Sequence, residues 1–140
     1  MRVFLDANIL VSVLNKEFPY YTFTSRILSM ADNKEAKTTL VTSTICLAIA
    51  FYFAEKKHGH IVAKNKMGIL AQHIDIAECG KKEALLTVQN KKVLDFEDGL
   101  EYYAALHAHC DCIVTNDLDD FYFSDMPVYP PERFYRKYIQ

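Results

Sequence analysis

The stretch "DFEDGLEYYAALHAHCDCIVTNDLDDF", from Asp95 to Phe121, decides the expected fold. Its first half is typical of a helix that begins just after Asp95, and "CIVT" (residues 112–115) has the length and apolar character of a buried strand. Acidic side chains flank both elements, with Asp98 in the first turn of the helix and Asp117 just beyond the strand. Helix starts and strand ends are the places where α/β folds build their sites. The stretch therefore predicts a site that draws on more than one element.

The rest of the chain alternates short apolar or β-branched runs with longer stretches of helical spacing. Strands are expected at residues 3–5, 38–43, 74–79 and 112–115, with an edge strand in the proline-flanked residues 126–130, and helices at residues 8–15, 20–30, 44–57, 60–73, 81–90, 97–110 and 131–138. Strands that alternate with helices predict a parallel sheet covered on both faces. The expected fold class is α/β, a three-layer sandwich with a central, mostly parallel sheet, in a single domain over residues 1–140.

The composition restricts the class of protein. Hydrophobic residues make up 51% of the 140 residues, which supports a buried core and argues against disorder. The net charge of −2 argues against a strongly basic nucleic-acid binder. No window approaches the roughly 18 apolar residues of a membrane span, and the four cysteines form neither a CxxC pair nor a zinc-ligand spacing. We therefore expect reduced thiols in a cytoplasmic protein without a secretory leader or membrane association.

Three acids are expected to meet at one edge of the sheet. Asp6 follows the apolar run "VFL", Asp117 follows "IVTN", and Asp98 lies where a helix starts. The carboxyl ends of parallel strands and the starts of the following helices share one rim. Clustered carboxylates repel one another, and a hard cation such as Mg²⁺ or Mn²⁺ relieves that repulsion. Such a cation polarises a phosphoryl oxygen and activates a water, which favours phosphodiester chemistry.

Each acid also has a plain structural explanation. Asp95 is expected to cap the helix that follows it, and the helix dipole alone favours an acid at Asp98. Asp119, Asp120 and Asp125 are compatible with solvated turns. Asp6 is harder to explain in this way, because an acid at the end of a buried strand needs partners. In the helix after Asp95, the residues expected to share one stripe are Leu100, Tyr103, Ala104 and His107.

The motifs at both ends of the chain resemble the PIN domain family. The similar segments are "VFLDANILVSVL", "DFEDGLEYYAALHAHCDCIVTNDLDDF" and "MPVYPPERF", in the order in which the family has them. The resemblance implies a mixed α/β fold and, in many members, a metal-dependent ribonuclease, including the toxins of VapBC toxin–antitoxin pairs. It implies that Asp6, Asp98 and Asp117 are the catalytic and metal-binding acids. The supporting residues that it implies are Asn8, Asp95, Thr115, Asn116 and Asp120.

One position departs from the family's pattern. The family usually places a glutamate on the helix after the second strand, and this chain has Ile49 there. An isoleucine cannot bind a cation. Glu101 lies one turn after Asp98 on the same helical face and is a candidate substitute. The departure weakens the expectation of a two-metal site and leaves a site with three acids and one metal.

Three functions remain open from the sequence. The first is a Mg²⁺- or Mn²⁺-dependent ribonuclease, a hydrolase that cleaves single-stranded or structured RNA, with an antitoxin protein as partner and a homodimer as the assembly. The second is a PIN-like module that has lost catalysis and binds RNA or a protein, as Ile49 suggests. The third is a response-regulator or phosphatase-type domain, which also uses aspartates at a sheet rim. That class is disfavoured because "LDAN" lacks the second aspartate of a D-x-D pair.

Overall fold

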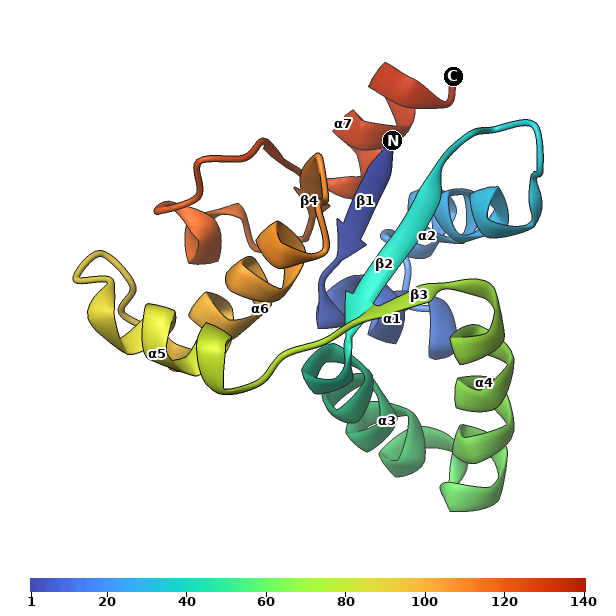
Figure 1. The fold of residues 1–140 in the computed structure, drawn as a ribbon. Helices are drawn as coiled ribbons and strands as arrows, with labels where there is room; N and C mark the ends of the chain where they lie inside the picture. Colours follow the sequence, from blue (N-terminus) through green and yellow to red (C-terminus); the bar gives the residue numbers. More distant parts are fainter.

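A computed structural model describes residues 1–140 and contains one five-stranded, wholly parallel sheet with the strand order β3-β2-β1-β4-β5 (Figure 1). The strands are β1 (Arg2–Leu5), β2 (Thr39–Ser43), β3 (Asp75–Ala77), β4 (Cys112–Val114) and β5 (Val128–Tyr129). The α-helices are α1 (Ala7–Leu14), α2 (Tyr21–Leu28), α3 (Thr44–His58), α4 (His60–His73), α5 (Lys81–Gln89), α6 (Phe96–His107) and α7 (Pro131–Tyr138). Two short 3₁₀ helices follow α2 and β4, at Ser29–Asp32 and Leu118–Phe121.

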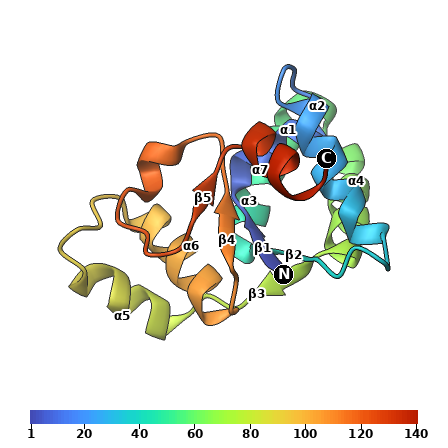
Figure 2. The ribbon, with the colours of Figure 1, turned by 90° about the horizontal axis from the view of Figure 1, so that it is seen from above.

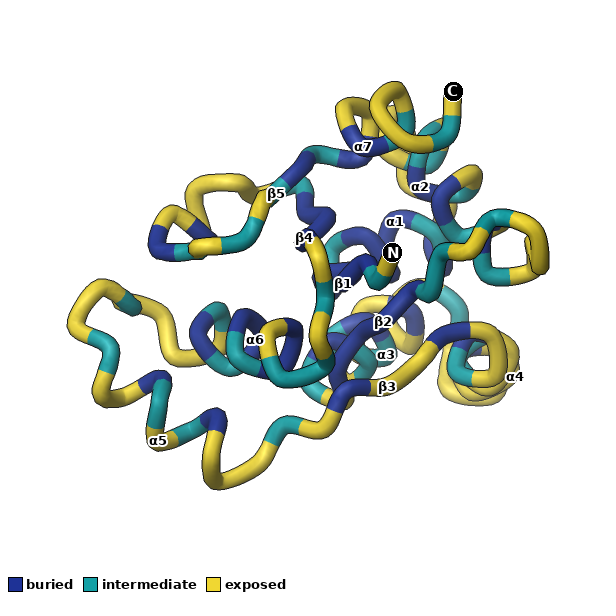
Figure 3. The backbone as a smooth tube through the Cα atoms, turned by 45° about the horizontal axis from the view of Figure 1, so that its top comes forward, coloured by how far each residue is buried: buried dark blue, intermediate teal, exposed yellow.

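The central strand β1 pairs with β2 on one side and with β4 on the other. Val3 lies opposite Leu40 of β2 on one side and opposite Cys112 of β4 on the other. Val3, Phe4 and Leu5 are fully buried, as a strand covered on both faces requires. The middle of the sheet is accordingly coloured as buried in Figure 3. Helices α5 and α6 lie on one side of the sheet, and α1, α2 and α4 lie on the other (Figure 2).

Polar residues at the ends of strands start the helices that follow them. The Asp6 side chain accepts the Ala7 N–H at 2.6 Å where α1 begins, and Ser43 accepts the Cys46 N–H at 3.2 Å at the start of α3. Asp95 accepts the Asp98 N–H at 3.1 Å and caps α6. Each of these bonds satisfies a backbone donor that the first helical turn leaves free.

The expected elements are confirmed, with one difference in α6. The sheet is α/β and parallel, and the proline-flanked strand β5 lies at its edge. Of the stripe predicted for α6, only Ala104 is fully buried, because the helix contacts two neighbours with two different faces. Tyr103 and His107 point to α5, where the Tyr103 hydroxyl accepts from Asn90 and His107 lies 2.6 Å from Glu83. The residues of α6 that are buried are Gly99, Glu101, Tyr102, Ala104 and Ala105.

Two further observations concern the chain as a whole. All four cysteines are free thiols, as expected from their spacing. None of the helices combines the length and the apolar character that crossing a bilayer requires.

Candidate active site

A pocket of about 340 Å³ lies over the carboxyl edge of the sheet. Asp6 comes from the end of β1, Asp98 from the first turn of α6 and Asp117 from the loop after β4, and all three line this pocket. The structure therefore brings together the three acids that the sequence singled out. The remaining acidic residues of the lining are Glu17, Glu97, Glu101 and Asp120. No lysine, arginine or histidine lines the pocket.

Asp6 is the most constrained of these acids. Its side chain is buried and accepts three hydrogen bonds. The Ala7 N–H donates to Oδ1 at 2.6 Å, while the Thr115 hydroxyl and the Asn8 amide donate to Oδ2 at 2.7 and 3.2 Å. Three donors from three directions fix the orientation of the carboxylate. The Asp6 carboxylate is therefore oriented by the protein itself, without a bound ligand.

Asn8 and Thr115 connect Asp6 to Asp117. The Asn8 amide donates to Asp117 Oδ2 at 3.3 Å and to the Thr115 hydroxyl at 3.1 Å, and the Asp117 N–H donates to that hydroxyl at 3.0 Å. Asn116 contributes its backbone N–H, which donates to Asn8 Oδ1 at 3.1 Å, whereas its own side-chain oxygen has no partner. Asn8, Thr115 and Asn116 thus act as a frame that positions two acids.

Burial and the charges of neighbouring acids raise the pKa values of Asp98 and Asp120. Burial is the main factor that raises the pKa of Asp98 to about 7, and the charges of Asp120, Asp95 and Asp6 add to it. Burial also raises the pKa of Asp120, followed by the charge of Asp117. Asp95 caps α6 and is not among the residues that line the pocket. Its contribution to the site is structural, through the position of the first turn of α6.

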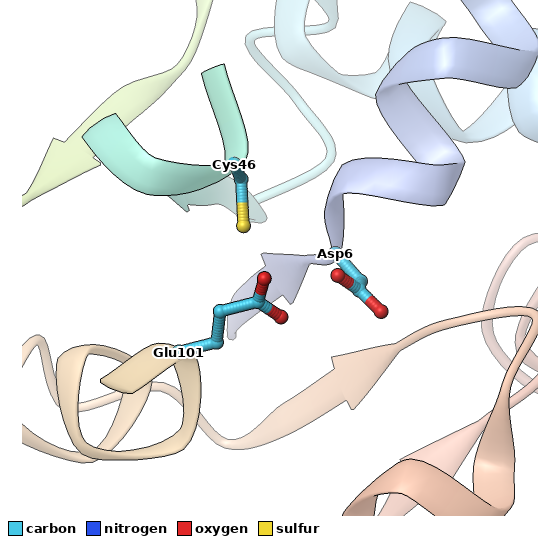
Figure 4. Close-up of side chains that lie close together, drawn as sticks. All are labelled: Asp6, Cys46 and Glu101. Carbon is cyan, nitrogen blue, oxygen red and sulfur yellow. The ribbon is translucent and has the colours of Figure 1, made fainter. Parts of the chain in front are cut away.

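Glu101 is the acid that the sequence left undecided. It is 1% exposed, and its Oε2 atom has no hydrogen-bond partner. Figure 4 shows the Glu101 carboxyl directed from α6 toward Asp6 and toward Cys46 of α3. Burial raises the pKa of Glu101 to about 11, and the charge of Asp6 is the next cause. The one signal in the sequence was its position a turn beyond Asp98.

The donor set fits a hard divalent cation. Asp6, Glu101 and Cys46 each offer a ligand atom, and these three atoms lie within 4.8 Å of one another. Burial raises the pKa of the Cys46 thiol well above its ordinary value. A thiol is a soft ligand, so a hard cation favours the two carboxylates over Cys46. Carboxylate oxygens are what Mg²⁺ and Mn²⁺ prefer. Such a cation would provide a partner for the Oε2 atom of Glu101, which makes no hydrogen bond.

Comparison with known proteins gives a family model and relatives over most of the chain. The model described as "PIN domain" matches residues 2–119. A protein named Ribonuclease VapC1, from Aquifex aeolicus, is 25% identical over 140 residues, which is 95% of this chain and 92% of the relative. The solved structure of VapBC2 from Rickettsia felis, bound to a DNA fragment, superposes with a TM-score of 0.69 at 19% identity and covers 91% of this chain and 97% of that one. VapBC-1 from nontypeable Haemophilus influenzae has a TM-score of 0.68 at 17% identity and covers 94% and 99%.

Proposed function

The chain belongs to the PIN domain family, and we propose that it is a Mg²⁺- or Mn²⁺-dependent ribonuclease that acts as the toxin of a toxin–antitoxin pair. The observation that carries the proposal is the pocket in which Asp6, Asp98 and Asp117 converge from three separate elements. An acidic pocket without any basic residue is unsuited to a polyanion unless a cation is bound. RNA hydrolysis at a cation held there is the chemistry that such a pocket serves best.

The relatives support the substrate and partner classes. The curated relative that matches 95% of the chain is named a ribonuclease, and two similar solved structures are VapBC pairs. The proposal therefore includes single-stranded or structured RNA as substrate, an antitoxin protein as partner and a homodimer as assembly. It also includes residues 1–140 acting as one domain, since the pocket takes Asp6 from one end of the chain and Asp120 from the other.

In the proposed mechanism, Asp6, Asp98 and Asp117 hold the cation. When bound, the cation would supply positive charge at the scissile phosphate and would lower the pKa of a nearby water. Thr115 and Asn8 keep the carboxylates of Asp6 and Asp117 oriented through the hydrogen bonds described above. The side chains of Val11, Ile49 and Phe53 form an apolar wall of the same pocket.

The test is cleavage of a labelled single-stranded RNA by the full chain. We expect cleavage with Mn²⁺ or Mg²⁺, none with a chelator, and a loss of roughly 10²- to 10³-fold in Asp98→Asn, the scale typical of removing one group that stabilises the transition state. Asp125→Asn removes an exposed acid that does not line the pocket and serves as the matched control. RNA that is bound but stays intact at every concentration of both cations would replace this proposal with the binding-module alternative.

A further inference from the structure

We propose that Glu101 supplies the pocket with a further ligand for the divalent cation, delivered from α6, at a site where α3 presents only the apolar side chains of Ile49 and Phe53. The inference rests on the proposed function, because it concerns the same pocket and the same cation. It assigns a role to a residue that the three-acid site does not need.

The burial of Glu101 calls for a partner. The side chain is 1% exposed, and its Oε2 atom makes no hydrogen bond. Buried carboxyl oxygens are almost always paired, because leaving them without a partner forfeits the hydration that they had in the unfolded chain. An unpartnered oxygen that faces other ligand atoms is the pattern expected of a site that completes itself by binding something.

No cationic group of the protein provides that partner. None of the four ion pairs of the chain involves Glu101, and no basic side chain lines the pocket. The nearest neighbour of known chemistry is another carboxylate, Asp6, whose three hydrogen bonds already come from Ala7, Asn8 and Thr115. The charge of Glu101 must therefore be neutralised by a proton or by a cation from solution.

The geometry favours the cation. The ligand atoms of Asp6, Cys46 and Glu101 lie within 4.8 Å of one another. Two oxygens bound to one Mg²⁺ ion at about 2.1 Å each are at most about 4.2 Å apart, so small rotations of the side chains suffice. In Figure 4 the carboxyl of Glu101 already points between Asp6 and Cys46. Sulfur is a soft ligand, so Mg²⁺ or Mn²⁺ would be held by the carboxylates of Asp6 and Glu101 rather than by Cys46.

The experiment measures Mn²⁺ binding to the metal-free full chain, by calorimetry and by the rise in the thermal unfolding midpoint. We expect Glu101→Gln to weaken Mn²⁺ binding by tenfold or more. Glu97→Gln is the matched control, since Glu97 is an exposed acid of the same helix that lines the rim of the same pocket. We expect this control to change the affinity less than threefold.

A second variant tests the position rather than the charge alone. Ile49 lines the same pocket from α3, so Glu101→Gln combined with Ile49→Glu returns a carboxylate to the cavity from another element. We expect the double variant to regain most of the Mn²⁺ affinity lost in Glu101→Gln. The unfolding midpoints without metal report whether each variant folds. If Glu101→Gln does not fold, the double variant and Glu101→Asp take its place in the test.

The outcomes separate the two proposals. If the wild-type chain does not bind Mn²⁺, the proposed function fails. If the wild type binds Mn²⁺ and Glu101→Gln binds it equally well, the role of Glu101 is refuted and the three-acid ribonuclease stands. Loss of Mn²⁺ binding in Cys46→Ala but not in Glu101→Gln would equally overturn the assignment, because the thiol would then be the ligand.

Discussion

At the scale of single residues, Thr115 helps to orient Asp6 through its hydroxyl group. It donates to Asp6 Oδ2 at 2.7 Å and accepts the Asp117 N–H at 3.0 Å, so one fully buried side chain serves two acids. Thr115→Val keeps the shape of the side chain and removes these two bonds, together with the one that the hydroxyl accepts from the Asn8 amide at 3.1 Å. We expect a loss of about 1–3 kcal/mol in the free energy of unfolding, because the Asp6 carboxylate, the Asp117 N–H and the Asn8 amide each lose a partner. Mn²⁺ affinity and RNA cleavage should fall as well.

The matched control for this variant is Thr42→Val. Thr42 is equally buried, and its hydroxyl donates to the Leu5 carbonyl at 2.9 Å without touching an acid. We expect this variant to lose stability in chemical denaturation but to bind Mn²⁺ as the wild type does. Equal losses of Mn²⁺ affinity in both variants would mean that general destabilisation, and not the orientation of Asp6, explains the effect of Thr115→Val.

The raised pKa values of two acids predict how stability depends on pH in the presence of a chelator. Asp98 has a pKa of about 7 and Glu101 of about 11 in the folded chain, against 3.8 and 4.5 for these groups in the unfolded chain. Between those values the folded state holds more protons than the unfolded state, so stability falls as the pH rises. The contribution of Asp98 is complete below about pH 4 and is lost as the pH passes through about 7.

We therefore expect the unfolding midpoint of the metal-free chain to drop between pH 5 and pH 8, measured by circular dichroism in chelator. Asp98→Asn carries no ionisable group at this position and should show a shallower drop over the same range. A wild-type midpoint that rises steadily from pH 5 to pH 8 would contradict the burial of these carboxyls.

Residue identity predicted part of this site and packing decided the rest. Asp6, Asp98 and Asp117 could be found from the sequence because each follows a recognisable strand end or helix start. Glu101 could not be assigned, because the side of a helix that becomes buried depends on what packs against it. The stripe predicted for α6 left Glu101 outside the buried face, whereas the sheet and α3 enclose it.

At the scale of elements, the contact between α5 and α6 determines where Asp98 and Glu101 lie. Gly99 sits between these two acids, and a Cβ there would come within 2.4 Å of Thr87 Cγ2 and 2.7 Å of Val93 Cγ1. At this position only hydrogen fits without movement of the neighbouring side chains. The glycine thus allows α6 to approach α5 closely, with the Glu83–His107 pair fastening the other end of the contact.

Gly99→Ala is therefore expected to destabilise the fold by about 1–3 kcal/mol, the usual range for overpacking, even though alanine favours helices. Gly68→Ala is the control, because Gly68 is also in a helix interior and no atom lies within 4 Å of its added Cβ. That variant should gain up to about 1 kcal/mol. Both are measured by urea denaturation, and a gain in both would show that α5 and α6 are not tightly packed.

Element types were predictable because local patterns carry them. Continuous apolar runs such as "VFL" and "CIV" specify strands covered on both faces, and Ser43 and Asp95 mark the starts of α3 and α6. The two 3₁₀ helices and the wholly parallel pairing were not specified in this way. They depend on how loops close between elements that are distant along the chain.

At the scale of the whole molecule, negative charge is concentrated at one edge. The chain has a net charge of only −2, yet seven acids and no basic side chain line the pocket. The pocket therefore repels RNA phosphates until a cation is bound, and this repulsion should be measurable without catalysis. Asp98 is suited to the test, because at pH 8 its carboxyl is above its pKa of about 7 and carries most of its charge.

We expect Asp98→Asn to bind single-stranded RNA about two- to fivefold more tightly than the wild type at pH 8 in chelator and low salt. Removing one charge a few ångströms from a phosphate is worth up to about 1 kcal/mol in a solvated pocket. The difference should fade at high salt, because screening shortens the range of the repulsion to about 3 Å at 1 M. Asp125→Asn removes an equal formal charge from the exposed surface away from the pocket and should change the affinity less. The RNA affinities of the wild type and the two variants are measured by fluorescence anisotropy with labelled RNA. Equal affinities for the wild type and Asp98→Asn at low salt would mean that RNA does not approach this edge, and the acidic pocket would then need another substrate.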